Sequence, residues 1–123
     1  LTSFPLLDVS NGTNFSFAWG NNSLTSFPLL DVSNGTNFSY AWRDNNLTSF
    51  PLLDVSSGTN FNASWSNNDL DAQSVQNILQ ALVNNGSTGL NTIIGKDGSP
   101  LTATAQTLYD TLTVTRGWTI TFN

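Results

Sequence analysis

Apolar side chains recur at fixed intervals along the first 69 residues of the chain. Three segments of 23 residues, 1–23, 24–46 and 47–69, align without insertion, and we call them units 1, 2 and 3. Each unit carries Leu, Phe and Leu at its positions 1, 4 and 6, Val at 9, Phe at 15 and Trp at 19. A fixed period of this length is typical of repeat proteins in which each unit covers the apolar face of the next. The pattern therefore predicts a solenoid with these side chains pointing inward.

Within each unit the same three local elements are expected. LTSFPLL favours a short strand, DVSNGTN a polar turn with positive φ at the glycine of position 12, and FSFAW or FSYAW a compact return segment. Proline at position 5 removes a ladder donor, so regular pairing should be brief and lie to one side of it. Stacking at about 4.8 Å would align three aromatic columns: Phe4, Phe27 and Phe50; Phe15, Phe38 and Phe61; Trp19, Trp42 and Trp65.

The last part of the chain, 70–123, does not repeat. Apolar residues at helical spacing predict a helix at about 71–84, with Asp71 as its N-cap and Gly86 after its end. A second helix is expected at about 102–112, and strands are expected at about 90–94 and 118–122. We expect this segment to cap the last unit, because about 50 residues are few for an independent core.

The repeated positions resemble a known type of repeat. L-x-x-F-x-L, followed by an aromatic residue and by Ala-Trp on a 23-residue period, is similar to the leucine-rich repeats of BspA-like bacterial and phage surface proteins. The resemblance covers 1–69, and it departs from the family where Trp replaces Phe, Asn stands for Cys and proline occupies position 5. It implies an α/β-type solenoid of three coils, each with a short parallel strand, closed by a helix-strand-helix-strand cap. It also implies a surface location, a role in adhesion or assembly, and no enzymatic activity.

Charge is scarce and unbalanced. Eight acidic residues, all of them Asp, stand against Arg43, Lys96 and Arg116, which gives a net charge of −5. The chain therefore lacks a basic surface for nucleic acid or an anionic membrane, and its apolar runs are shorter than the roughly 20 residues that a spanning helix requires. A surface of Asn, Ser, Thr and Gly is typical of extracellular repeat proteins, so we expect a location outside the cell or on a virion.

The residue types present limit the chemistry. Without His, Cys or Glu the chain lacks the common general bases, thiol nucleophiles and soft metal ligands, so we expect neither an enzyme nor a bound cofactor. Asp8, Asp31 and Asp54 share position 8 and form the one candidate metal column, for calcium. Each also has the sequence of an Asx turn, DVSNGT, and we favour this interpretation over calcium.

Asparagine is the most informative polar residue. Sequons of the form Asn-x-Ser/Thr, which are candidates for N-glycosylation, occur at Asn11, Asn14, Asn21, Asn34, Asn37, Asn46, Asn62 and Asn85. Asn11 and Asn34 precede a glycine in a turn from which a glycan could project. Asn14, Asn37 and Asn60 persist where the third unit loses its sequon, so we interpret this column as a ladder of amides that bond neighbouring units.

One candidate function is self-assembly. If unit 1 leaves Phe4, Phe15 and Trp19 unshielded, copies of the chain could stack head to tail through this assembly face and form a surface fibre. Because the chain begins within the repeat, we also expect it to be a processed product or a piece of a longer polypeptide.

The other candidate function is recognition. Positions 17 and 20 vary between units, which marks Phe17, Tyr40 and Arg43 as a ligand face for a carbohydrate or a host receptor. A surface that binds ice or a mineral, suggested by the threonine column at Thr2, Thr25 and Thr48, has less support, because one column seldom matches a flat lattice.

Overall fold

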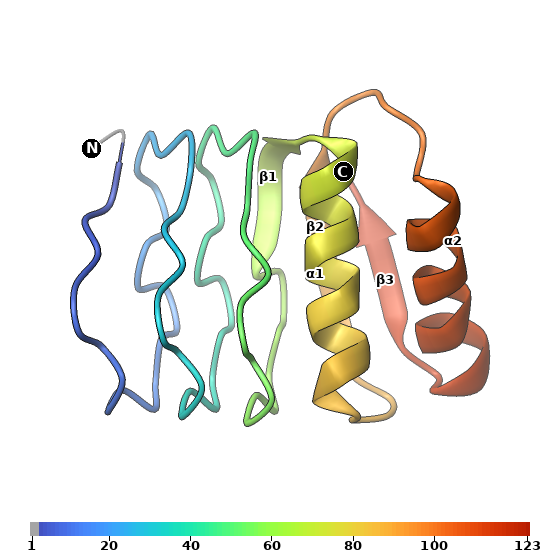
Figure 1. The fold of residues 1–123 in the computed structure, drawn as a ribbon, viewed down its shortest axis with the longest axis horizontal. Coiled ribbons are helices and arrows are strands. Elements are labelled where there is room, and N and C mark those ends of the chain that lie inside the picture. Colours follow the sequence, from blue (N-terminus) through green and yellow to red (C-terminus); the bar gives the residue numbers. More distant parts are fainter. Residues whose placement is uncertain (1–2) are drawn as a thin grey trace.

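The computed structural model describes residues 3–123 (Figure 1). Leu1 and Thr2 lie outside the described residues, so the inward position expected for Leu1 and the first member of the threonine column are not addressed. The units follow one another along the long axis of the molecule, and the non-repeating segment continues beyond unit 3 (Figure 1).

The expected fold class is wrong. The structure has one open sheet of three parallel strands in the order β1-β2-β3, together with two helices, and all of these elements lie within 65–123. It is not a solenoid of three leucine-rich-repeat coils, because 3–64 contains neither a regular strand nor a helix. Within 3–64 the only β-type pairs are two isolated parallel bridges, which join Asn14 to Asn37 and Asn37 to Asn60.

Two features of each unit prevent a regular strand. Proline at position 5 has no N–H to donate, so LTSFPLL cannot form a continuous ladder. Positions 17 and 21 take left-handed backbone conformations, with φ of 58° at Phe17 and 57° at Asn21, and such residues turn the chain out of an extended path. The sequence pattern identifies the proline but gives no sign of left-handed residues at a Phe or a Tyr.

The units nevertheless pack against one another in register. The indole rings of Trp19 and Trp42 lie 5.5 Å apart at 10°, and those of Trp42 and Trp65 lie 5.3 Å apart at 10°. The Phe columns at positions 4 and 15 stack in the same way, at 5.5 to 6.0 Å. All three aromatic columns expected from the period are thus present, and Trp42 and Phe38 are fully buried.

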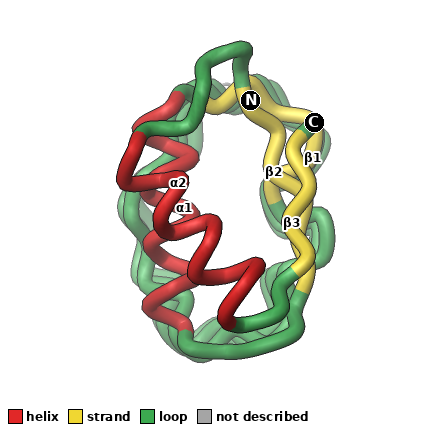
Figure 2. The backbone as a smooth tube through the Cα atoms, turned by 90° about the vertical axis from the view of Figure 1, so that its right-hand side faces the viewer, coloured by secondary structure: helices red, strands yellow, loops and turns green. Residues whose placement is uncertain are grey.

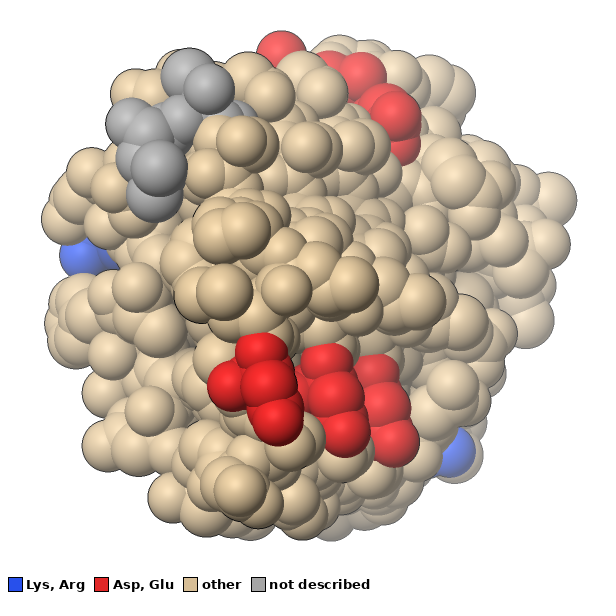
Figure 3. All heavy atoms as spheres, turned by 60° about the vertical axis from the view of Figure 1, so that its left-hand side comes forward, with Lys and Arg blue, Asp and Glu red and all other residues tan. Residues whose placement is uncertain are grey.

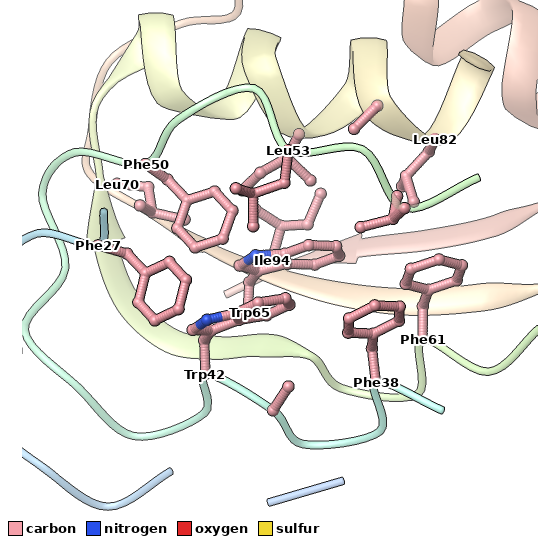
Figure 4. Close-up of a cluster of buried hydrophobic side chains, with 14 of the residues drawn as sticks. Phe27, Phe38, Trp42, Phe50, Leu53, Phe61, Trp65, Leu70, Leu82 and Ile94 are labelled. Atoms are coloured by element: carbon pink, nitrogen blue, oxygen red, sulfur yellow. The ribbon is translucent and has the colours of Figure 1, made fainter. Parts of the chain in front are cut away.

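The Phe rings of position 4 meet the buried indoles edge-on. Among the described residues, Nε1 of Trp42 and Nε1 of Trp65 are buried without a hydrogen-bond partner. Phe27 lies edge-on to Trp42 at 79°, and Phe50 lies edge-on to Trp65 at 85°. The nitrogen end of each indole lies on the side of these Phe rings (Figure 4).

Of the two leucine positions expected to point inward, position 1 is confirmed by the buried Leu24 and Leu47, and position 6 is wrong. Position 6 points to solvent, with exposed fractions of 73% at Leu6 and 66% at Leu29, whereas Leu30 and Leu53 at position 7 are buried. The glycine of position 12 also differs from expectation, because Gly12, Gly35 and Gly58 do not have positive φ. Instead, the Phe ring three residues later packs directly on each of these glycines, where a Cβ would overlap it.

Residues 65–123 form the regular part of the molecule. Strand β1 spans Trp65–Leu70, α1 spans Ala72–Asn85, β2 spans Asn91–Lys96, α2 spans Ala103–Asp110, and β3 spans Thr119–Phe122. A short π-helix, η1 at Thr111–Thr115, follows α2 directly. The Asp71 side chain accepts from the Ser74 N–H at the start of α1, and Gly86 takes a left-handed conformation after its end. Both helices and both later strands lie close to the positions expected from the sequence.

The helices and the strands lie on opposite sides of the chain path (Figure 2). Helix α1 packs on unit 3, where the side-chain amide of Asn77 donates to the Phe50 carbonyl and that of Asn85 donates to the carbonyls of Val55 and Gly58. Strand β2 pairs with β1, which contains the last residues of unit 3. The far side of unit 3 is therefore covered by the chain's own C-terminal segment.

Candidate functional site

Two aromatic rings are stacked on the surface of units 1 and 2. Phe17 and Tyr40 both occupy position 17, and their ring centroids lie 4.7 Å apart at 13°. The side chain of Phe17 is 60% exposed, which is unusual for a ring in a stack. We call Phe17, Tyr40 and Arg43 the aromatic surface.

The backbone that carries these rings is strained. Phe17, Tyr40 and Ala63 occupy the same position and have φ of 58°, 57° and 51°. A left-handed conformation raises the energy of a residue with a side chain by roughly 1–2 kcal/mol, and it favours Gly, Asn or Asp. Position 21 satisfies this preference with Asn21, Asp44 and Asn67, but position 17 does not.

Polar groups surround the second ring. The guanidinium carbon of Arg43 lies 5.3 Å from the centre of the Tyr40 ring, and Arg43 Nε pairs with the Asp44 carboxylate at 3.0 Å. The Asn62 amide donates to the Tyr40 hydroxyl at 3.3 Å. The structure therefore brings together the three residues that the sequence identified as a ligand face, and it adds an amide and a carboxylate beside them.

The candidate assembly face is less open than expected. Phe15 and Trp19 are only 7% and 4% exposed, so the expectation that unit 1 leaves these two rings unshielded is wrong. They are covered because each unit's rings stack on one another as well as on the next unit, with Phe15 5.3 Å from Trp19. Phe4 is partly buried against the same core. Whether copies of the chain associate at this end stays a prediction.

The aspartate column forms turns, as expected. Oδ1 of Asp8, of Asp31 and of Asp54 each accepts from the backbone N–H two residues later, at 3.0 Å. The hydroxyl of Ser33 and its backbone N–H hold the pKa of Asp31 below its usual value, and the equivalent bonds from Ser10 lower the pKa of Asp8. Figure 3 shows acidic side chains in a row on the surface. In the part of the chain that the structure describes, no three acidic side chains are grouped closely enough to hold a metal ion.

The candidate glycosylation sites fall into two groups. Asn11, Asn21 and Asn46 are exposed, and none of their side chains has a hydrogen bond within the described residues. The others have a side-chain partner: Asn14, Asn34, Asn37, Asn62 and Asn85. Asn85 differs most from the first group, because its nitrogen donates to two backbone carbonyls between α1 and unit 3.

This difference gives an expected pattern of glycosylation. In a secretory host that modifies sequons, Asn11, Asn21 and Asn46 should be occupied in the folded protein, whereas Asn85 should be unmodified because its amide nitrogen is engaged. Peptide mass spectrometry after enzymatic deglycosylation in heavy-oxygen water measures occupancy at each site. Full occupancy at Asn85 with none at Asn11 would contradict the assignment.

The asparagine ladder lies at a different position from the one expected. Oδ1 of Asn14 and of Asn37 accepts within its own turn, so position 14 does not link units through its amide. The linking residue is at position 22. Asn45 accepts from the Leu24 N–H at 3.1 Å and donates to the Trp19 carbonyl at 2.8 Å, and Asn68 repeats the pattern toward Leu47 and Trp42.

A column of exposed leucines is the second apolar feature of the surface. Leu6, Leu29 and Leu52 lie in the segment that also carries the aspartates. Beside Leu52 a hollow opens between unit 3 and α1, and its lining includes Asp54, Ala81 and Asn84. Asp54 is the titratable side chain among the residues that line this hollow.

Neither helix of the described residues has the length and apolar character needed to cross a bilayer. The aromatic surface combines an exposed ring, left-handed backbone and polar partners. Comparison with protein-family models, with curated proteins and with solved structures finds no match to this chain.

Proposed function

We propose that this chain is a carbohydrate-binding interaction protein that holds its ligand on the aromatic surface. The observation that carries the proposal is the stack of the exposed Phe17 ring on the half-buried Tyr40 ring, both on a left-handed backbone. Low charge and a surface rich in Asn, Ser and Thr agree with a location outside the cell.

Stability alone does not account for these two rings. An aromatic pair contributes about 0.5–1.5 kcal/mol beyond burial, which roughly offsets the conformational energy of one left-handed residue, about 1–2 kcal/mol. Unit 3 places Ala63 at the same position and keeps the same backbone conformation. The fold of a unit therefore does not require an aromatic side chain there, and a second role for the rings is needed.

The chemistry of the surface suits a sugar. A pyranose ring has an apolar C–H face, which packs on an aromatic ring, and hydroxyl groups that need donors and acceptors at its edge. Phe17 supplies an open ring face, and Arg43, Asp44 and Asn62 supply polar groups within the same surface. Nucleic-acid bases would also stack on the rings. The net charge of −5, with one arginine at the site, would repel the phosphate backbone of a nucleic acid.

Head-to-tail assembly has less support. Copies that join through their units would need the far side of unit 3 to be free, and α1 and β2 cover it. A fibre would then have to use surfaces other than those between the units.

The proposal predicts a specific loss of binding. We expect the wild-type chain to bind on an array of immobilised neutral and acidic oligosaccharides. Phe17→Ala and Tyr40→Ala should each lower the affinity for the best-bound oligosaccharide at least tenfold, about 1.4 kcal/mol. Each substitution removes one ring of the stack on which the sugar would pack. Titration calorimetry measures the affinity. Both variants should fold, because unit 3 already has alanine, Ala63, at this position.

Leu29→Ala is the matched control, since it also truncates an exposed apolar side chain. Its affinity should equal that of the wild type. A folded wild-type chain that binds no oligosaccharide, or Phe17→Ala and Tyr40→Ala variants that bind as the control does, would refute the proposed function.

A further inference from the structure

The outer edge of unit 1 differs from the same edge of units 2 and 3. Leu7 is 53% exposed, whereas Leu30 and Leu53 at the same position are 3% exposed. Val9 is half-buried, whereas Val32 and Val55 are buried. The residue types are identical, so the differences arise because units 2 and 3 have a unit on this side.

The hydrogen bonds between units all have the same direction in the return segment. Backbone N–H groups at positions 15, 17, 19 and 21 of one unit donate to carbonyls at positions 14, 16, 18 and 20 of the next. Units 1 and 2 are joined in this way at 2.8–3.0 Å, and so are units 2 and 3. Each unit therefore presents a row of acceptors to the unit before it.

Unit 1 has the same row of acceptors with nothing bound to most of it. Among residues 3–123, no donor reaches the backbone carbonyls of Asn14, Ser16 or Ala18, and that of Gly20 accepts only from the Asn22 amide at 3.3 Å. The equivalent carbonyls of unit 2, from Asn37 to Arg43, each accept an N–H from unit 1.

A contact in the opposite direction completes the pattern. The N–H and hydroxyl of Thr36 both donate to the Thr13 carbonyl, at 2.8 and 3.1 Å, and Thr59 donates in the same way to Thr36. The N–H and hydroxyl of Thr13 have no acceptor among residues 3–123. The open edge thus offers four carbonyls and one pair of donors at defined positions.

We propose that this edge is a binding surface for a further 23-residue unit of the same repeat sequence. Such a unit would supply N–H groups at its positions 15, 17, 19 and 21, a carbonyl at position 13, and rings that stack on Phe4 and Phe17. The inference rests on different observations from the carbohydrate proposal, the backbone hydrogen bonds and the apolar edge, and an added unit would cover the face of Phe17 that the carbohydrate proposal assigns to a sugar.

The far end of another copy does not match this edge as well. Its last unit is covered by α1 and β2, and its outermost strand, β3, is four residues long. Two copies cannot meet through their unit 1 edges either, because both edges present mainly acceptors. The repeat sequence itself is the partner that satisfies both the hydrogen bonds and the apolar side chains.

The test adds one unit to the full chain. The sequence of residues 24–46 is fused before Leu1, and a second fusion carries a scrambled sequence of the same composition. In the first fusion, hydrogen exchange should be at least tenfold slower at positions 15, 17, 19 and 21 of the added unit than in the scrambled one. The urea midpoint should also rise above that of the unextended chain.

A third fusion separates the two kinds of contact. It carries alanine at positions 4, 15 and 19 of the added unit and should lose the slow exchange, because the stacked rings hold the unit in place. Equal exchange rates and urea midpoints in the repeat and scrambled fusions would overturn the proposal. A second outcome would also overturn it. If the unextended chain forms a dimer, and adding the repeat unit changes neither the dimer nor the urea midpoint, the added unit does not occupy this edge.

Discussion

Replacing Trp42 by alanine should lower the free energy of unfolding by about 3–5 kcal/mol, as expected for truncating a buried Trp. Trp42 is fully buried and stacks on Trp19 and Trp65, while Phe27 and Phe50 meet it edge-on. The cavity would lie in the middle of the units, where hydrogen bonds on both sides limit collapse. Urea unfolding followed by far-ultraviolet circular dichroism measures the loss.

Phe17→Ala is the matched control for this prediction. It also removes an aromatic ring from a stack, but Phe17 is largely exposed and Ala63 shows that alanine is accepted at the position. We expect a change below about 1 kcal/mol, somewhat more than the roughly 0.5 kcal/mol of a typical exposed substitution, because one ring-on-ring contact is lost. Equal losses for the two variants would show that the buried indole column does not dominate stability.

Replacing Asn45 by alanine should lower the free energy of unfolding by about 2–4 kcal/mol, because buried backbone groups would lose their partner. The Asn45 side chain is 6% exposed. It accepts from the Leu24 N–H and donates to the carbonyls of Trp19 and Trp42, at 2.8 to 3.1 Å. Alanine offers neither a donor nor an acceptor, and the surrounding rings leave little access for water.

Asn46→Ala provides the control for the asparagine ladder. Asn46 is adjacent in sequence and exposed, and its side chain has no hydrogen bond within the described residues. Its effect should stay within about 0.5 kcal/mol. Thermal and urea unfolding of both variants give the comparison, and an Asn45→Ala variant as stable as Asn46→Ala would contradict the assigned role.

The sequence predicts the contacts that depend only on the period. Aromatic residues at positions 4, 15 and 19 stack between units because neighbouring units lie in register, whatever the path of the chain between them. The amphipathic spacing and the Asp71 cap likewise indicate α1. These features follow from local rules that a single sequence contains.

The direction of each side chain is harder to predict. Leucine occurs at both positions 6 and 7, and asparagine at both 14 and 22, in all three units, so the period supports either choice. The structure selects positions 7 and 22, because the proline and the left-handed residues set the turns of the backbone. The exposed stack of Phe17 and Tyr40 has the same origin, since no local rule places Phe or Tyr in a left-handed conformation.

The constant separation of bonded partners affects how the molecule folds. Hydrogen bonds such as those from Thr36 to Thr13 and from Thr59 to Thr36 join residues 23 positions apart. Adding each unit therefore closes a loop of the same length, at the same cost in chain entropy. Helix α1 forms locally and contacts unit 3 directly. Folding can therefore start at the C-terminal segment and proceed one unit at a time toward the N-terminus, with unit 1 the first to open under denaturant.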